Sequence, residues 1–388
     1  MPVSLGNNIH IYQSDIQVES RVQRHCVALA GSGLFEQMYF LGCTSGNKRT
    51  EEFSVDCNAT MLERADTSGR GLWFKLMETR KWSREVFETV GELGATCISC
   101  HSLPALAVCC RLKNQLSCRL VYEPHELETE TVVSHGVRKW LSRRTEAFYI
   151  GHCDAVITVN DSIADWYASA YSITRPFVIK NMPSRNGRSD SPPDKEYFRK
   201  RYDIPKEANI FLYQGWIGEG RRISQYIRIF GQLNGEQHLI LMGGFSDPDL
   251  ESVVRQSVED KSNIHYHEAV PPGDLLRFTA CADVGLCGVE DICESYRLSL
   301  PNKIFEYLSA GIPCLAPDFP EIARVIRQTG AGWLHPDSES GLTKRILAIG
   351  EEDIDSKREH ALEACEDFDW PTQAKALVSA YREVMQNF

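Results

Sequence analysis

The sequence predicts an α/β protein built from two domains, each a doubly wound parallel sheet with helices on both faces. The chain has 388 residues, which is enough for two domains at roughly 100–200 residues each. Short apolar runs alternate with amphipathic segments, as expected for parallel sheets. The alternation stops at residues 184–195, which are rich in proline, serine, aspartate and arginine, and then starts again. We therefore expect one domain at 1–184, a second at 196–370, and a terminal helix at 371–388.

In the first half of the chain, strand and helix patterns alternate from the start. Residues 8–12 have the composition of a short strand, and residues 18–30 place apolar side chains at helical spacing. Gly31 and Gly33 end that helix. The strands expected next are 37–41, 95–100, 119–122 and 155–159, and the helices are 103–112 and 162–170.

The second half repeats the pattern after the linker. We expect strands at 210–214, 238–242, 264–266, 283–286 and 313–316, and helices at 223–233, 273–281, 302–310, 319–328 and 371–385. In open α/β sheets, ligands bind at the carboxyl ends of the strands. The expected site is therefore the cleft between the two domains.

The charge balance argues against nucleic acid as a partner. The chain has 42 Lys and Arg residues against 53 Asp and Glu residues, a formal net charge of −11, which opposes binding to phosphate polymers. The N-terminus reads MPVSLGN, without the pattern of a signal peptide, and nowhere do 18 apolar residues follow one another. We expect a cytoplasmic protein that does not span a membrane.

The 14 cysteines are spread thinly through a large chain that lacks an export signal, so we expect most of them to be reduced and buried. Cys97 and Cys100 have the spacing of a redox or zinc motif. They lie in an apolar run, however, and no second CxxC follows at a zinc-ribbon interval. A structural strand is the favoured interpretation.

The run SLPNKIFEYLSAGIP at 299–313 is the most informative segment. Pro301 belongs in the first turn of a helix, and Gly311 marks its other end. The N–H groups of that first turn, together with the helix dipole, are suited to hold a diphosphate. Lys303 either adds a positive charge there or lies on the solvated face of the helix.

Glu306 is the only charged residue between Ile304 and Pro317. A carboxylate in such apolar company must be exposed or must find hydrogen-bond donors, because burying it unpaired costs several kcal/mol. A ribose diol offers two such donors. The alternative is an ordinary glutamate on the helix surface.

A glycine-rich loop follows the strand expected at 210–214. Gly215, Gly218 and Gly220 allow tight turns and close approach to a ligand, and Arg221 adds a permanent cation. This combination suits a pyrophosphate, although the spacing matches neither the Walker loop nor the dinucleotide fingerprint. The alternative is a structural turn with solvated Arg221 and Arg222.

Two further features bear on the partners of the protein. His101 and His125 each follow a strand, where cleft residues occur, but a lone histidine is more often structural. The segments 71–82 and 137–144 interleave aromatic with basic side chains. Such helices either lie on anionic lipid, as a peripheral contact, or pack on the first domain as ordinary amphipathic helices.

Nearly the whole chain resembles the GT-B glycosyltransferases of the family-4 type, also described as glycosyl transferases group 1. The run 299–313 resembles the donor-site motif of this family, and Tyr122–Glu126 (YEPHE) resembles its YDxHE segment. The other matching segments are 15–33, 155–160, 180–183, 211–221, 282–286 and 368–370.

The resemblance implies retaining transfer of a sugar from a nucleotide diphosphate sugar to a hydroxyl acceptor, in polysaccharide or glycoconjugate biosynthesis. It also implies two Rossmann-like domains, with a C-terminal helix that crosses back to the first. The leaving phosphate takes the acceptor proton in such enzymes, so no enzymic nucleophile, metal or cofactor is expected, and UDP-sugars are slightly favoured over GDP-sugars. The implied catalytic residues are His125, Glu126 and Arg221. The implied donor contacts are Gly215, Gly218, Gly220, Arg221, Pro301, Asn302, Lys303, Ile304 and Glu306.

The chain departs from the family pattern at Leu298, where a second glutamate usually contacts the transferred sugar. Leucine accepts no hydrogen bond, so this role passes to N–H groups at 300–302, to Glu294, or is lost. The candidates for sugar or acceptor contacts are His101, Glu294 and Leu300. Two alternatives to a transferase stay open: a nucleotide-sugar 2-epimerase, and a non-catalytic protein that binds a nucleotide or a partner.

Overall fold

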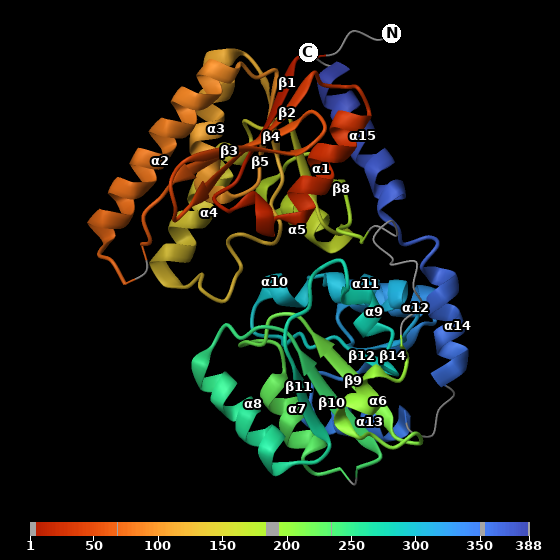
Figure 1. Cartoon of the computed structure of the whole chain (residues 1–388). Coiled ribbons are helices and arrows are strands. Elements are labelled where there is room, and N and C mark those ends of the chain that lie inside the picture. The colour runs from red at the N-terminus through yellow and green to blue at the C-terminus, as the bar shows by residue number, and fades with distance from the viewer. Residues whose placement is uncertain (1–4, 68, 184–193, 234, 350–353, 387–388) are drawn as a thin grey trace. The chain divides into compact units, whose positions relative to one another are not determined.

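The computed structural model describes residues 5–67, 69–183, 194–233, 235–349 and 354–386 of the chain. It divides into two compact units (Figure 1). Unit 1 comprises Met1–Asn181 and Gln373–Phe388, and unit 2 comprises Met182–Thr372. Most of the expected linker, at 184–193, lies outside the described residues.

Within the described residues, unit 1 contains an eight-stranded sheet in the order β3-β4-β2-β1-β5-β6-β7-β8. Its strands are β1 (Asn7–Ile11), β2 (Gln37–Thr44), β3 (Arg49–Ser54), β4 (Cys57–Glu63), β5 (Cys97–Cys100), β6 (Arg119–Tyr122), β7 (Ala155–Thr158) and β8 (Phe177–Val178). All neighbours pair in parallel except β3 and β4. The sequence did not predict this antiparallel edge pair, because β3 is polar and half-exposed and has no apolar run.

Strand β5 confirms the structural interpretation of the CxxC segment. All four of its residues, Cys97 to Cys100, are buried in the centre of the sheet between β1 and β6. Every cysteine lies in the described part of the chain. None of the fourteen forms a disulfide bond, and most are buried, as the sequence predicted.

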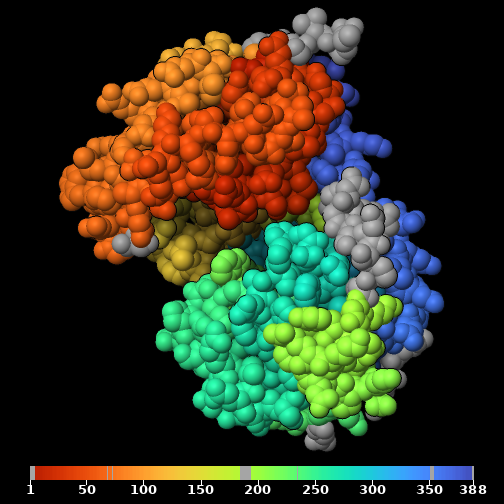
Figure 2. Space-filling model, viewed as in Figure 1, coloured from red at the N-terminus to blue at the C-terminus, as the bar shows by residue number. Residues whose placement is uncertain are grey.

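The helices of unit 1 cover both faces of its sheet. They are α1 (Ser20–Gly31), α2 (Leu72–Leu93), α3 (Leu103–Leu116), α4 (Gly136–Ile150), α5 (Asp161–Tyr171) and the part of α15 (Trp370–Gln386) that begins at Gln373. On one face α3 lies between α2 and α4, while α1 and α15 lie on the other (Figure 1). The long helix α2 is at the surface of unit 1 (orange in Figure 2).

Unit 2 contains, within the described residues, a six-stranded parallel sheet in the order β11-β10-β9-β12-β13-β14. The strands are β9 (Asn209–Gln214), β10 (Gln237–Met242), β11 (Ile264–His267), β12 (Val284–Leu286), β13 (Cys314–Pro317) and β14 (Gly332–His335). The helices are α6 (Tyr197–Tyr202), α7 (Ile223–Phe230), α8 (Pro248–Asp260), α9 (Leu275–Thr279), α10 (Glu294–Arg297), α11 (Asn302–Ala310), α12 (Pro320–Thr329), α13 (Glu339–Ile349) and α14 (Ile354–Ala364).

The bounds of α11 agree with the sequence prediction, whereas α9 is shorter than the expected helix at 273–281. Apolar side chains pack on both faces of the sheet and form two core layers. The buried Tyr307 of α11 donates hydrogen bonds to the carbonyl oxygens of Leu212 (3.2 Å) and Leu286 (3.0 Å). Gly285 leaves room for the Tyr307 ring, since a Cβ atom there would collide with it. This contact seats α11 on strands β9 and β12.

None of the helices in the described residues combines the length and the apolar character that crossing a membrane requires.

Candidate functional site

The loop between β9 and α7 approaches other backbone closely. Gly215 has a φ of +106° and Gly220 a φ of +74°, conformations that glycine adopts without strain. A Cβ atom on Gly243 would collide with the carbonyl of Gly215, and one on Gly218 with the hydroxyl of Ser246. The three loop glycines therefore have local steric roles.

The two arginines that follow the loop differ in their surroundings. Arg222 is 2% exposed, forms an ion pair with Asp337 and donates from Nε to the carbonyl of Val289 at 2.8 Å. The interpretation of Arg222 as a solvated residue was wrong, because its guanidinium is a buried structural group. Arg221 instead stacks on the Tyr296 ring, 5.0 Å from its centroid. Among the described residues, no carboxylate lies within ion-pair distance of Arg221.

Helix α11 begins at Asn302. Pro301 is the N-cap residue, one position before the first turn in which the sequence placed it. Within the described part of the chain, no side chain caps the N-terminus of the helix, so a cap does not take up the first-turn N–H groups. Asn302 is exposed and Lys303 half-buried, whereas the side chain of Ile304 is buried in the core. Ile304 therefore has only backbone groups to offer a ligand.

Glu306 is half-buried on α11 and is held by a side chain of the adjacent strand. Gln214 Nε2 donates to Glu306 Oε2 at 2.7 Å, and the hydroxyl of Thr279 donates to Gln214 Oε1 at 2.7 Å. Gln214 and Thr279 are buried. The alternative of an ordinary surface glutamate does not describe this position. Gln214 and Thr279 were missed by sequence reasoning, since neither residue type stands out.

Lys303 brings a second cation close to Glu306 and Arg221. Its Nζ donates to the Tyr213 hydroxyl at 3.1 Å and lies 4.4 Å from the centre of that ring. Burial and the charge of Arg221 lower the pKa of Lys303 to about 8, while Glu306 acts in the opposite direction. Unit 2 thus brings together Arg221, Lys303 and Glu306, three of the residues that the sequence singled out.

Leu298, where the chain departs from the family pattern, and the residues near it differ in how far they are exposed to solvent. Glu294 is exposed at the start of α10, and Leu298 is half-buried at the end of this short helix. The Leu300 side chain is buried in the core, so any contact of Leu300 with a sugar would have to use its backbone.

In unit 1, the structure brings His101 and His125 together. His101 Nδ1 lies 3.1 Å from His125 Nε2, and His101 Nε2 lies 2.7 Å from Nδ1 of His10 in the adjacent strand β1. Glu126, the neighbour of His125, is exposed. The sequence did not point to His10, whose place beside His101 follows from the pairing of β1 with β5.

A buried carboxylate, Glu123, lies next to these histidines. His25 Nδ1 is 2.9 Å from Glu123 Oε2, and the Tyr381 hydroxyl of α15 donates to Glu123 Oε1. Burial opposes ionisation of Glu123, but His101, His25 and His10 together hold the pKa of its carboxyl well below the usual range. Burial lowers the pKa of His10 to about 4 and keeps the pKa of His101 and of His125 well below 6.5.

One group in the described residues could offer metal ligands: His10, His101 and Glu123, with one ligand atom from each within 4.8 Å of the others. The nitrogens of His10 and His101 face each other at 2.7 Å, however, which is a hydrogen-bond distance. His10 and His101 therefore belong to a hydrogen-bond network.

Residues 209–352 match the family described as glycosyl transferases group 1. The probable glycosyltransferase WbjE of Pseudomonas aeruginosa is 24% identical over 269 residues, which are 63% of this chain and 63% of WbjE. The match therefore spans less than two thirds of that relative.

Solved structures share the fold over nearly the whole chain. Sucrose-phosphate synthase from Thermosynechococcus elongatus has a TM-score of 0.79 at 17% identity, covering 99% of this chain and 100% of that one. HepE from Anabaena, in complex with UDP-glucose, has a TM-score of 0.72 at 14% identity, covering 97% and 99%. WaaG, a glycosyltransferase of lipopolysaccharide biosynthesis, has a TM-score of 0.68 at 14% identity, covering 97% and 98%. The chain has the GT-B fold, and its residues 209–352 resemble the group 1 glycosyl transferases.

Proposed function

We propose that this protein transfers a sugar from a nucleotide diphosphate sugar to a hydroxyl acceptor in polysaccharide or glycoconjugate biosynthesis. The observation that carries the proposal is the carboxylate of Glu306, held by Gln214 and close to Lys303, whose pKa also responds to the charge of Arg221. A carboxylate accepts hydrogen bonds from a ribose diol, and two cations suit a diphosphate. HepE was solved with UDP and with UDP-glucose, which supports this class of donor and favours UDP.

The donor contacts follow from the chemistry of each group. Glu306 accepts from the ribose hydroxyls, while Arg221, Lys303 and the first-turn N–H groups of α11 bind the diphosphate. Negative charge grows on the diphosphate as the bond to the sugar breaks. Cations already placed beside it stabilise that charge most in the transition state, so Arg221 has a catalytic role.

His125 and Glu126 of unit 1 are proposed to contact the transferred sugar or the acceptor, with His101 behind His125. Retention of configuration without a metal is part of the proposal, and the leaving phosphate oxygen then takes the acceptor proton. NMR of the product tests the retention, which an inverted anomer would contradict. Activity that depends on a divalent cation would contradict the metal-free mechanism.

Leu298 leaves sugar recognition to other groups. Glu294 is exposed and has acceptor oxygens, whereas Leu300 offers only its backbone. We therefore propose a donor whose sugar does not need a second carboxylate at position 298.

The experiment for the proposed function combines binding with product analysis. Thermal unfolding is followed with UDP, GDP and ADP and their sugars, since a specific ligand raises the apparent stability. Products are then measured with and without acceptors. Free UDP and a rearranged sugar without acceptor would indicate a 2-epimerase, which the named transferase relatives do not favour. Nucleotide binding without any product would indicate a non-catalytic protein.

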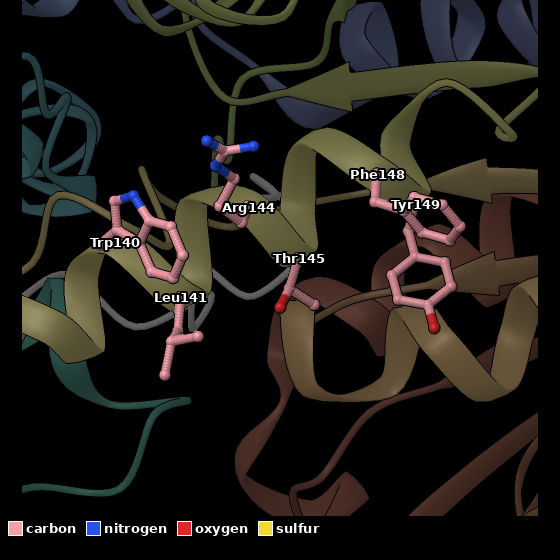
Figure 3. A pocket seen from close by; sticks show the side chains of 6 residues that line it. All are labelled: Trp140, Leu141, Arg144, Thr145, Phe148 and Tyr149. Atoms are coloured by element: carbon pink, nitrogen blue, oxygen red, sulfur yellow. The ribbon is translucent and has the colours of Figure 1, made fainter.

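A peripheral contact of unit 1 with the cytoplasmic face of a membrane is also proposed. Along α4, Trp140, Leu141 and Phe148 are 57%, 53% and 65% exposed and line a surface hollow with Arg144 (Figure 3). The guanidinium of Arg144 stacks on the Trp140 ring at 5.3 Å. Within α4 only Glu146 and Ile150 are buried, so packing on the domain does not use up these apolar side chains.

The nearby helix α2 has the same character. Trp73 and Met77 are strongly exposed there, and the same helix carries the basic residue Lys75. Exposed aromatic and basic side chains together suit an anionic lipid surface. Sedimentation with vesicles containing phosphatidylglycerol should show binding that is lost at high salt and reduced in Trp140→Ala. Absence of binding at low salt would refute this contact.

A further inference from the structure

Three histidines of unit 1 form a chain of hydrogen bonds that ends at His125. His10 Nδ1 lies 2.7 Å from His101 Nε2, and His101 Nδ1 lies 3.1 Å from His125 Nε2. His10 and His101 are completely buried, whereas His125 is half-buried. These hydrogen bonds lead from the interior of the sheet to His125, the residue that the proposed function places beside the ligand.

The direction of these hydrogen bonds determines what His125 offers. Burial lowers the pKa of all three rings, so each is neutral at pH 7 and carries one N–H. Each contact joins two ring nitrogens, of which one must donate and the other accept. Only two arrangements satisfy both contacts: either every ring carries its proton on Nδ1, or every ring carries it on Nε2.

The unpartnered nitrogen of His10 favours the first arrangement. His10 Nε2 is buried and has no hydrogen-bond partner in the described part of the chain. With protons on Nε2 throughout, His10 would bury an N–H that has no acceptor. With protons on Nδ1 throughout, His10 Nε2 carries only a lone pair. Unsatisfied acceptors are tolerated better in protein interiors than unsatisfied N–H groups.

The charge of Glu123 favours the same arrangement. Its Oε2 lies 3.9 Å from His101 Nδ1, too far for a hydrogen bond but close enough for a strong electrostatic effect. A carboxylate attracts a proton on the nitrogen that faces it and repels a lone pair there. Glu123 is kept in place by His25 and by the Tyr381 hydroxyl of α15.

We propose that the chain His10–His101–His125 fixes His125 as the Nδ1–H tautomer, so that His125 donates a hydrogen bond to an oxygen of the bound sugar or acceptor. His10 and His101 are then positioning residues. His125 Nε2 already accepts from His101 and its Nδ1 carries the proton, so no lone pair remains to take the proton of the acceptor hydroxyl. The ligand contact rests on the proposed transferase function, whereas the tautomer does not.

The tautomer is measurable on the whole wild-type protein without substrate. In two-bond ¹H–¹⁵N correlation spectra of histidine-labelled protein, the cross-peak pattern of each ring shows which nitrogen is protonated, and single His→Asn variants assign the rings. We expect His101 and His125 to be Nδ1–H tautomers at pH 7. An Nε2–H tautomer or an imidazolium at His125 would overturn the proposal.

Two substitutions at His101 test the positioning role. His101→Asn retains an amide N–H near the position of Nδ1, so His125 should keep its tautomer and kcat should stay within about threefold of wild type. His101→Leu removes the donor, so the His125 proton should move toward Nε2 and kcat should fall roughly 10- to 100-fold, with UDP affinity unchanged. An unchanged His125 tautomer in His101→Leu would refute the positioning role. If the wild-type protein forms no product, the proposed function fails while the spectra still decide the tautomer.

Discussion

The side-chain amide of Gln214 donates a hydrogen bond of 2.7 Å to Glu306, and this contact orders the carboxylate before any ligand binds. Gln214 is the last residue of β9 and is itself fixed, because its oxygen accepts from Thr279. Three elements of unit 2, β9, α9 and α11, therefore define where the Glu306 carboxylate lies. A preorganised acceptor loses less conformational freedom when it binds a ribose.

Replacing Glu306 by Ala should weaken UDP binding roughly 10- to 100-fold. The change removes hydrogen bonds to a charged group, which contribute about 1.5–3 kcal/mol. Titration calorimetry measures the effect, with Glu339→Ala on the exposed face of α13 as a control of the same charge change. Equal UDP affinity in Glu306→Ala and wild type would remove Glu306 from the donor site.

Gln214→Leu should weaken UDP binding less than Glu306→Ala, by about 3- to 10-fold, because the carboxylate remains but is no longer held. The buried Thr279 hydroxyl would keep its second partner, the carbonyl of Leu275 at 2.8 Å. The free energy of unfolding should therefore fall by only about 1 kcal/mol. Urea unfolding and calorimetry separate the two effects. A larger loss of affinity than in Glu306→Ala would show that Gln214 itself binds the ligand.

Adjacent arginines should respond in opposite ways to the same substitution. Arg221→Met should reduce kcat at least tenfold with little change in stability, because its cation is proposed to stabilise the leaving diphosphate. Arg222→Met should instead lower the free energy of unfolding by about 2–3 kcal/mol, because it leaves the carbonyl of Val289 without its donor and removes the ion pair with Asp337. Steady-state kinetics and urea unfolding of both variants check this. The reverse pattern would exchange the two assignments.

Stability should decrease as the pH falls from about 6.5 to 4. Burial lowers the pKa of His10, His265 and His335 to about 4, whereas the unfolded chain binds these protons near pH 6.5. Between these values the unfolded state holds more protons than the native state, so acid favours unfolding. Melting temperatures at pH 7.5, 6, 5 and 4.5 measure the trend, and His335→Asn should make it shallower. A melting temperature that is constant from pH 7.5 to 5 would contradict the burial of these rings.

Much of the site was visible in the sequence where chemistry is concentrated in a short run. The segment at 299–313 predicted the helix Asn302–Ala310 and singled out Glu306, because proline, an isolated carboxylate and glycine are informative at fixed spacing. Gln214 and Thr279 are common residue types that meet only through the packing of β9 and α9. Their pairing required the structure.

The histidine network shows the same limit. His10 and His101 are 91 residues apart and meet because β1 pairs with β5. Arg221 and Arg222 are neighbours with the same side chain. Only the fold shows that Arg222 is buried against Asp337 while Arg221 stacks on Tyr296. The edge strand β3 escaped prediction because it is polar, partly exposed and without an apolar run.

The most direct test of the central claim is product formation from a panel of UDP- and GDP-sugars with hydroxyl acceptors, comparing wild type with Glu306→Ala. The account predicts an acceptor glycosylated by the wild-type protein, release of the nucleoside diphosphate in equal amount, and at least a tenfold lower kcat/KM in the variant. Nucleotide binding by the wild-type protein without product from any donor and acceptor, or turnover equal in both proteins, would contradict it.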